Sequence, residues 1–207
     1  SSKKEVSAKI SQCIVVLRKL QQFWTNPNCP TKFKLIIFDA VIRSKLVYGL
    51  DSLQINEGTL KHLNAFQLKG LRKILGLKTT YVERANSNKV VFSKANALKN
   101  PKKVPGKAIK PFSSYIQSQQ NKLLAHIIRA EKDDPLRQTT LSEGTHYPYK
   151  IEKRRVGRPR NDWTWSTYER ILQINIPTPK DLWKADPYAY MDMLKPAILN
   201  RTIKILQ

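Results

Sequence analysis

Residues Phe33 to Leu77 read FKLIIFDAVIRSKLVYGLDSLQINEGTLKHLNAFQLKGLRKILGL, and this stretch decides the fold of the chain. It holds two apolar runs with helical spacing, separated by a polar break at residues 51–58. Their apolar positions are Phe33, Ile36, Ile37, Val41 and Val47 in the first run, and Leu60, Leu63, Phe66 (or Gln67), Leu71, Ile74 and Leu75 in the second. Because Gly49 and Gly76 stand where a helix end favours positive φ, we predict a hairpin of two amphipathic helices, each burying one stripe.

The outward faces of this hairpin carry almost no acid. Their cations are Lys34, Arg43, Lys45, Lys61, Lys69, Arg72 and Lys73. A solvated helix face normally pairs its charges at i±4, and here such acidic partners are nearly absent. We therefore predict that a polyanion contacts Arg43, Lys45, Lys69, Arg72 and Lys73, with a merely solvated face as the alternative.

An earlier helix precedes the hairpin. Its apolar stripe is Val6, Ile10, Cys13, Ile14, Leu17 and Leu20. Asn26-Pro27 stops this helix, and Thr31 is placed to cap the next one. Together these helices predict a three-helix bundle. A further helix over Lys89–Ala97, capped by Ser87 or Asn86, completes a first domain at residues 1–98.

Residues 99–111 have a different composition, combining three prolines, a glycine and several lysines (NPKKVPGKAIKP from Asn100). We predict an exposed basic linker and a domain boundary here.

Residues 112–207 predict a second, looser helical region. One helix runs from Phe112 to Glu131 and ends at Asp133-Asp134-Pro135, with the two aspartates as cap and turn residues. A loop, with a short hairpin as an option, follows over Arg137–Ile151. Asn161 or Asp162 then caps a helix that begins near Trp163, and prolines interrupt the helical pieces after it. The whole chain is expected to be all-α, a helical bundle followed by a basic linker and this second region.

The formal charge is +23, from 38 Lys and Arg against 15 Asp and Glu. Such an imbalance requires a polyanionic partner, with nucleic acid first and an anionic membrane surface second. No apolar run approaches the roughly 18 residues that span a bilayer, and no signal peptide opens the chain. We expect an intracellular, nuclear protein with no membrane partner.

Two cysteines and three scattered histidines complete no ligand set. We expect Cys13 and Cys29 to be reduced, and we predict no metal and no cofactor.

A second basic segment runs from residue 153 to 160. It comprises Lys153, Arg154, Arg155, Val156, Gly157, Arg158, Pro159 and Arg160. An extended Gly-Arg-Pro between arginines has the shape of an AT-hook, which inserts arginine into a narrow A·T minor groove. The simpler interpretation, which we favour, is a basic loop that contacts phosphates without choosing sequence; a purely structural role is the third option.

Aromatic residues lie beside or beyond this segment: Trp163, Trp165, Tyr168 and Trp183. At helical spacing they are expected in a core, with stacking on unpaired bases as the alternative. Trp165 falls off the stripe of Trp163 and Ile171, so it is the candidate for exposure.

Three segments carry a family resemblance. FDAVIRSKLVYGLDS (38–52) and FQLKGLRKILGL (66–77) resemble the thumb just downstream of the polymerase core in non-LTR (LINE-type) retrotransposon reverse transcriptases. KRRVGRPRNDW (153–163) resembles the GRPR-x-x-W segment that follows the thumb in many of those proteins. The resemblance spans roughly Leu17 to Trp165. It implies a thumb-like bundle that grips an RNA–DNA hybrid or DNA duplex and adjoins the palm and fingers of an upstream polymerase.

The polymerase signature of that family, Phe or Tyr, then Ala or Val, then two aspartates, is missing. The one Asp-Asp pair, Asp133-Asp134, sits in AEKDDPL. Because no nucleophile elbow and no phosphate-cradling glycine loop occurs either, we predict no catalytic residues and no autonomous enzyme activity. The rival interpretations are a helical protein-interaction module and a degenerate retroelement remnant.

Overall fold

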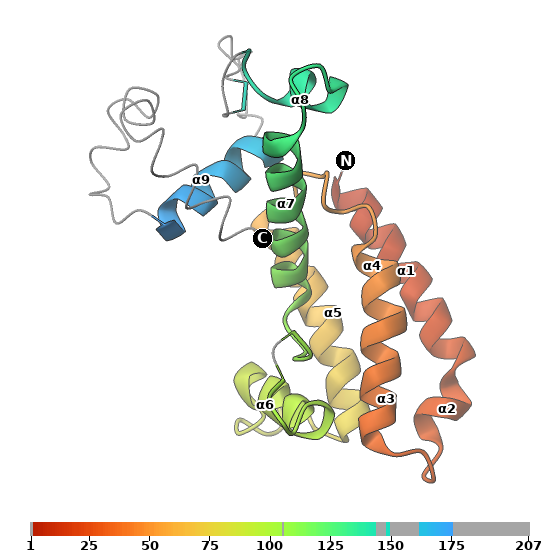
Figure 1. The fold of residues 1–207 in the computed structure, drawn as a ribbon. Helices are drawn as coiled ribbons and strands as arrows, with labels where there is room; N and C mark the ends of the chain where they lie inside the picture. The colour runs from red at the N-terminus through yellow and green to blue at the C-terminus, as the bar shows by residue number, and fades with distance from the viewer. Residues whose placement is uncertain (1, 105, 144–147, 150–161, 176–207) are drawn as a thin grey trace. The chain divides into compact units, whose positions relative to one another are not determined.

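The computed structural model describes residues 2–104, 106–143, 148–149 and 162–175, with only the backbone described for residues 172–175. Within these ranges every regular element is a helix, and the one exception is an isolated antiparallel bridge between Leu141 and Pro148 (Figure 1). The prediction of an all-α chain is confirmed. Two compact units are present, residues 1–116 and residues 117–207.

The first unit begins with helices α1 (Ser2–Lys19) and α2 (Gln21–Thr25). Val6, Ile10 and Cys13 are buried along one side of α1 as the spacing predicts, whereas Ile14 is 37% exposed. The indole of Trp24 donates a hydrogen bond of 3.1 Å to the carbonyl of Leu17. This bond holds α2 against the end of α1.

The next helical rod is α3 (Thr31–Ile37), a π-helical segment η1 (Phe38–Arg43) and α4 (Ser44–Val47). Thr31 does not cap it, because Pro30 occupies the N-cap position and no side chain caps the helix there. The rod ends as predicted, since Gly49 follows it with φ 69°.

The predicted buried stripe of this rod is wrong at three of its five positions, while Ile37 and Val47 are partly buried against the core. Its core side chains are Leu35, Phe38, Ile42 and Leu46, all at most 1% exposed. The predicted side chains Phe33, Ile36 and Val41 are instead 49%, 37% and 36% exposed. Residues 33–47 are apolar on more than one side, so two helical stripes fit the same spacing and periodicity cannot choose between them.

Helix α5 (Glu57–Leu75) forms the second arm of the hairpin. Asn56 caps it by accepting a hydrogen bond from the Thr59 backbone N–H, and Gly76 ends it with φ 65°. Leu63 and Leu71 are fully buried, and so is the side-chain amide of Gln67.

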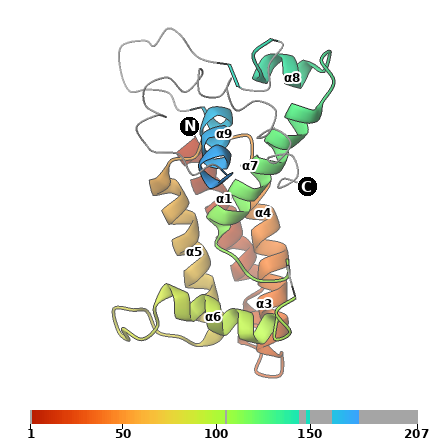
Figure 2. The same cartoon turned by 60° about the vertical axis from the view of Figure 1, so that its left-hand side comes forward.

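Helix α6 (Asn88–Lys99) packs against α3 and α5 and lies across the ends of these helices in Figure 2. Ser87 is its N-cap residue, as one of the two predicted alternatives. The core of the first unit therefore draws on α1 to α6 and on the first residues of the next helix, including Phe112 and Ile116.

The segment 99–111 is not exposed throughout. Lys102, Lys103, Lys107 and Lys110 are exposed as predicted. Ile109, by contrast, is 2% exposed and belongs to the core of the first unit. The prediction that this composition leaves no buried apolar surface is wrong at Ile109.

The second unit has its own small core. It is built from α7 (Phe112–Arg129, shared with the first unit), α8 (Pro135–Thr140) and α9 (Trp163–Asn175). Its buried members are Leu124, Ile127, Ile128, Leu141, Tyr168 and Ile171.

Capping explains how two of these helices begin. Asp134 caps α8 by accepting hydrogen bonds from the backbone N–H groups of Leu136 and Arg137, as its predicted cap role requires. Helix α8 itself lies where we expected a loop, so that part of the prediction is wrong. At α9, Asp162 accepts a hydrogen bond of 3.1 Å from the Thr164 backbone N–H.

Candidate nucleic-acid interface

Lys45, Lys69 and Lys73 are exposed cations on the helical hairpin. Lys69 and Lys73 are four residues apart on α5, so they lie on one side of that helix. The ammonium group of Lys73 donates a hydrogen bond of 3.1 Å to the side-chain oxygen of Gln21 on α2. This contact places the basic end of α5 beside the α1–α2 junction, one turn from the exposed Arg18. Arg18 therefore joins the lysines as a candidate that the sequence pattern did not single out.

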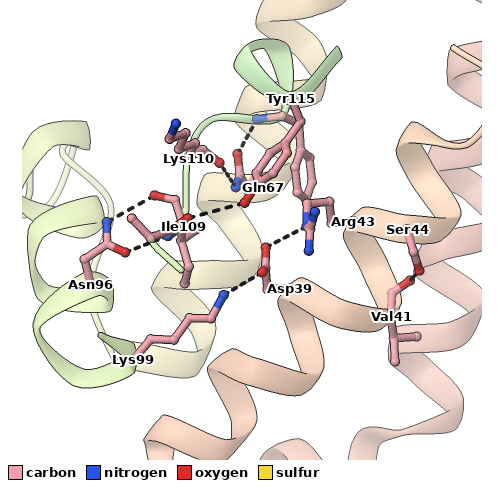
Figure 3. Close-up of polar contacts among 12 residues, drawn as sticks. Asp39, Val41, Arg43, Ser44, Gln67, Asn96, Lys99, Ile109, Lys110 and Tyr115 are labelled. Atoms are coloured by element: carbon pink, nitrogen blue, oxygen red, sulfur yellow. Dashed lines mark hydrogen bonds and ion pairs between the residues drawn. The ribbon is translucent and has the colours of Figure 1, made fainter. Parts of the chain in front are cut away.

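Arg43 is not a free surface cation. Its Nε lies 3.1 Å from Oδ1 of Asp39, and its guanidinium stacks 4.3 Å from the ring centroid of Tyr115. Asp39 is the acidic partner at i−4 that the sequence argument treated as nearly absent. Arg43 therefore joins η1 to the start of α7, and Figure 3 shows it between Asp39 and Tyr115.

Arg72 also has an internal role. Its guanidinium donates hydrogen bonds of 3.1 Å to the backbone carbonyl of Asn86 and 2.9 Å to the side chain of Asn88. These bonds tie α5 to the start of α6. Arg72 thus braces the fold, and a phosphate would have to compete with both acceptors.

Two further cations differ from the predicted outward face. Lys34 is only 9% exposed, and its ammonium group donates a hydrogen bond of 2.8 Å to the carbonyl of Asn26, so its predicted outward position is wrong. Lys61 is exposed but lies 3.7 Å from the carboxylate of Glu57. Lys34 and Lys61 are therefore weaker candidates for a phosphate contact than Lys69.

The predicted contact residues Lys153, Arg154, Arg155, Gly157, Arg158, Pro159 and Arg160 lie outside the described residues. So does Trp183. Trp163 and Trp165 pack against the core of the second unit, and the Trp165 indole donates a hydrogen bond of 2.8 Å to Glu169. Trp165 is therefore partly buried, so it is less exposed than we predicted.

Positive charge is concentrated in the first unit. Residues 1–116 contain 22 Lys and Arg against five Asp and Glu, a formal charge of +17 out of the total of +23. Seventeen of these 22 cations are exposed. Among the described residues only one of the seventeen, Lys61, has an ion pair. The unit therefore presents a surface of largely uncompensated positive charge.

The central polar contact of the unit was missed by the sequence argument. Asp39 is 5% exposed and pairs with Arg43 and with Lys99 at the end of α6. A carboxylate inside the apolar run IIFDAVI was the available signal, because a buried carboxylate requires a cationic partner. Its i+4 partner could have been found by spacing, whereas Lys99 could not.

Burial perturbs one group of this contact. Desolvation raises the pKa of the Tyr115 phenol, the negative charge of Asp39 adds to the rise, and Arg43 opposes it. Tyr115 is therefore neutral over the physiological range and serves as a stacking surface and a hydrogen-bond donor, to the carbonyl of Ala108 at 3.3 Å.

The described part of the chain holds neither a cluster of metal-ligand side chains nor a membrane-spanning helix. No group of three or more His, Cys, Asp or Glu side chains is arranged to hold a metal ion there. Nor does any helix in that part have the length and apolar character needed to cross a bilayer.

No protein-family model, curated protein or solved structure matches this chain.

Proposed function

We propose that this chain is a non-catalytic nucleic-acid-binding module that grips an RNA–DNA hybrid or DNA duplex through the phosphate backbone. The role is that of the thumb and post-thumb region of the LINE-type reverse transcriptases that the sequence resembles, working beside an upstream polymerase palm and fingers. The observation that carries the proposal is the formal charge of +17 in the first unit, most of it exposed and unpaired.

Charge of this kind suits backbone contact. Phosphate contacts give affinity and orientation without sequence information, and they need cations on a rigid framework. Lys45, Lys69 and Lys73 stand on helices that bury Leu46, Leu63 and Leu71 in the core of the first unit, which supplies that framework. We assign the main contacts to these three lysines together with the arginines of residues 153–160.

Fluorescence anisotropy of the isolated chain with a labelled RNA–DNA hybrid and with DNA duplexes, across a salt series, tests this function. We expect similar affinities for all duplexes and a steep salt dependence. Replacing Lys45, Lys69 and Lys73 with Gln should reduce the salt slope by about 0.9 for each lost contact. The matched control replaces three other exposed lysines, Lys3, Lys4 and Lys32, with Gln. Equal effects of the two triple variants would contradict the assignment of the site, and a folded chain that binds no duplex would contradict the function.

A second function, a helical protein-interaction module, has one observation in its favour. Phe33, Ile36 and Val41 leave an apolar side of the α3–η1 rod exposed. Apolar surface of this kind often marks a protein contact. A folded chain that fails to bind duplex at low salt would favour this second function, since an interaction module does not need bare nucleic acid.

A further inference from the structure

The basic segment between α6 and α7 is held in place by side-chain amides. At its start, Asn100 donates a hydrogen bond of 2.9 Å to the carbonyl of Val104 and accepts one of 2.9 Å from the N–H of the same residue. Asn96 makes the same pair of bonds with Ile109, at 3.1 Å and 2.7 Å (Figure 3). Each amide therefore binds the backbone of one residue through both its donor and its acceptor.

Two more amides, both on α5, hold the end of the segment. Gln67 donates a hydrogen bond of 2.8 Å to the carbonyl of Lys110 and accepts one of 2.9 Å from the N–H of Phe112. Asn64 binds the backbone N–H and the hydroxyl of Ser113, at 3.0 Å and 2.8 Å. Gln67 is fully buried, so its amide must be matched by partners of this kind.

Apolar side chains anchor the same segment between the amide contacts. Ile109 is 2% exposed and Phe112 is fully buried in the core of the first unit. The backbone near the turn also takes left-handed conformations, with φ 49° at Lys103 and φ 76° at Gly106. A lysine in this region is uncommon and persists where surrounding contacts determine the backbone. These contacts therefore hold the described residues of the loop in one backbone conformation.

Four exposed lysines project from this loop: Lys102, Lys103, Lys107 and Lys110. None of them forms an ion pair among the described residues. The sequence contains no Asp or Glu between Glu83 and Glu131, so no acidic residue flanks the loop along the chain. Four cations gathered without acid repel one another, and a polyanion relieves that repulsion.

We propose that Lys102, Lys103, Lys107 and Lys110 form a preorganised phosphate-contact site, the clamped lysine loop, that binds the backbone of a nucleic-acid strand. Its residues differ from the contacts assigned above, Lys45, Lys69 and Lys73, and the inference rests on the proposed function. The four amides order the loop before binding, so the ordering entropy is not lost again when the phosphates arrive.

The first test replaces all four loop lysines with Gln and measures duplex binding by anisotropy across a salt series. The matched control replaces four exposed lysines elsewhere, Lys3, Lys4, Lys32 and Lys122, and so changes the net charge equally. We expect the loop variant to lose about 0.9 of salt slope for each phosphate contact, and the control variant to lose clearly less.

A second test leaves every charge in place. Asn100→Ala removes one clamp at the exposed turn, and Asn28→Ala, in the exposed turn before α3, is its control. We expect Asn100→Ala to weaken duplex binding several-fold with an unchanged circular-dichroism spectrum, and Asn28→Ala to leave binding unchanged.

The outcomes separate the two proposals. If the unsubstituted chain binds no duplex, the proposed function falls and this inference falls with it. If the chain binds duplex and the loop variant behaves like its charge-matched control, this inference alone is overturned. The inference is also overturned if the loop variant loses the binding to phosphatidylserine vesicles that the unsubstituted chain shows, while it still binds duplex as the unsubstituted chain does. That result would assign the loop to a membrane surface.

Discussion

Asp39 in the π-helical segment η1 forms an ion pair with Lys99 at the end of α6, sixty residues further along the chain. Arg43 shares the same carboxylate from one turn away. The side chain of Asp39 is only 6% exposed, so these two cations are its main compensation. The pair joins α6, and through it the clamped lysine loop, to the helical rod of the hairpin.

Asp39→Asn should destabilise the first unit strongly. It leaves two partly buried cations without their anion, and breaking a buried pair from one side costs about 3–5 kcal/mol. Urea denaturation followed by circular dichroism measures the loss. Glu57→Gln, which breaks the exposed pair with Lys61, is the control and should change stability by less than about 1 kcal/mol. Similar midpoints for both variants would show that Asp39 does not hold α6 in place.

Gly70→Ala should destabilise α5 although alanine is the better helix former. A Cβ atom at Gly70 would come within 2.5 Å of the ring of Phe38. Phe38 is 1% exposed, and its ring packs edge-on against the ring of Trp24 with 6.4 Å between the two centroids. The ring therefore has little room to move. Overpacking of this kind costs about 1–3 kcal/mol, which outweighs the propensity gain of about 1 kcal/mol.

The matched control for this substitution is Gly58→Ala in the first turn of the same helix. A Cβ atom there meets only the side-chain oxygen of Asn56, at an ordinary 3.6 Å. Thermal unfolding should show a lower midpoint for Gly70→Ala and an equal or higher one for Gly58→Ala. The reverse order would contradict the packing of Phe38 against Gly70.

Gln67→Leu should loosen the connection between α5 and the start of α7. The substitution leaves the carbonyl of Lys110 and the N–H of Phe112 without their partner, and an unsatisfied buried polar group costs about 1–3 kcal/mol. Hydrogen exchange at the Phe112 amide should accelerate along with the loss of stability. Gln12→Leu, on the exposed side of α1, should change neither quantity.

The two thiols should differ in reactivity. Cys13 is buried, and desolvation raises the pKa of its thiol, against smaller lowering effects of Lys45 and Lys9. A raised thiol pKa means less thiolate at a given pH, so Cys13 should react slowly with a disulfide reagent at pH 8 and faster as the pH rises. Cys29 is partly exposed and should react first. Labelling of Cys29→Ser in native buffer checks this, and rapid labelling of that variant would contradict the buried position of Cys13.

Local signals were enough to predict where several helices begin and end. Gly49 and Gly76 follow helices with positive φ, and Ser87 and Asp134 cap the helices after them, because these effects depend on neighbouring residues alone. Thr31 is not the N-cap residue because α3 already begins at Thr31, which places Pro30 at the N-cap position.

The candidate site was predicted less completely. Composition and charge identified an exposed basic unit, and Lys45, Lys69 and Lys73 are exposed as expected. The internal roles of Arg43 and Arg72 were not predictable in full, because each depends on partners from other elements. For Arg43 the stacking partner is Tyr115, and for Arg72 the acceptors are Asn86 and Asn88.

The sequence by itself determined that this protein is helical, where several of its described helices begin or end, and that it carries a large uncompensated positive charge. These properties follow from backbone preferences, local capping and composition, none of which needs a distant partner. Only the tertiary structure decided which stripe of residues 33–47 is buried, since that rod offers two apolar stripes and packing selects one. It also decided that residues 100–104 and 106–113 are held by side-chain amides, because those of Asn64 and Gln67 reach this backbone from α5, a helix distant in sequence.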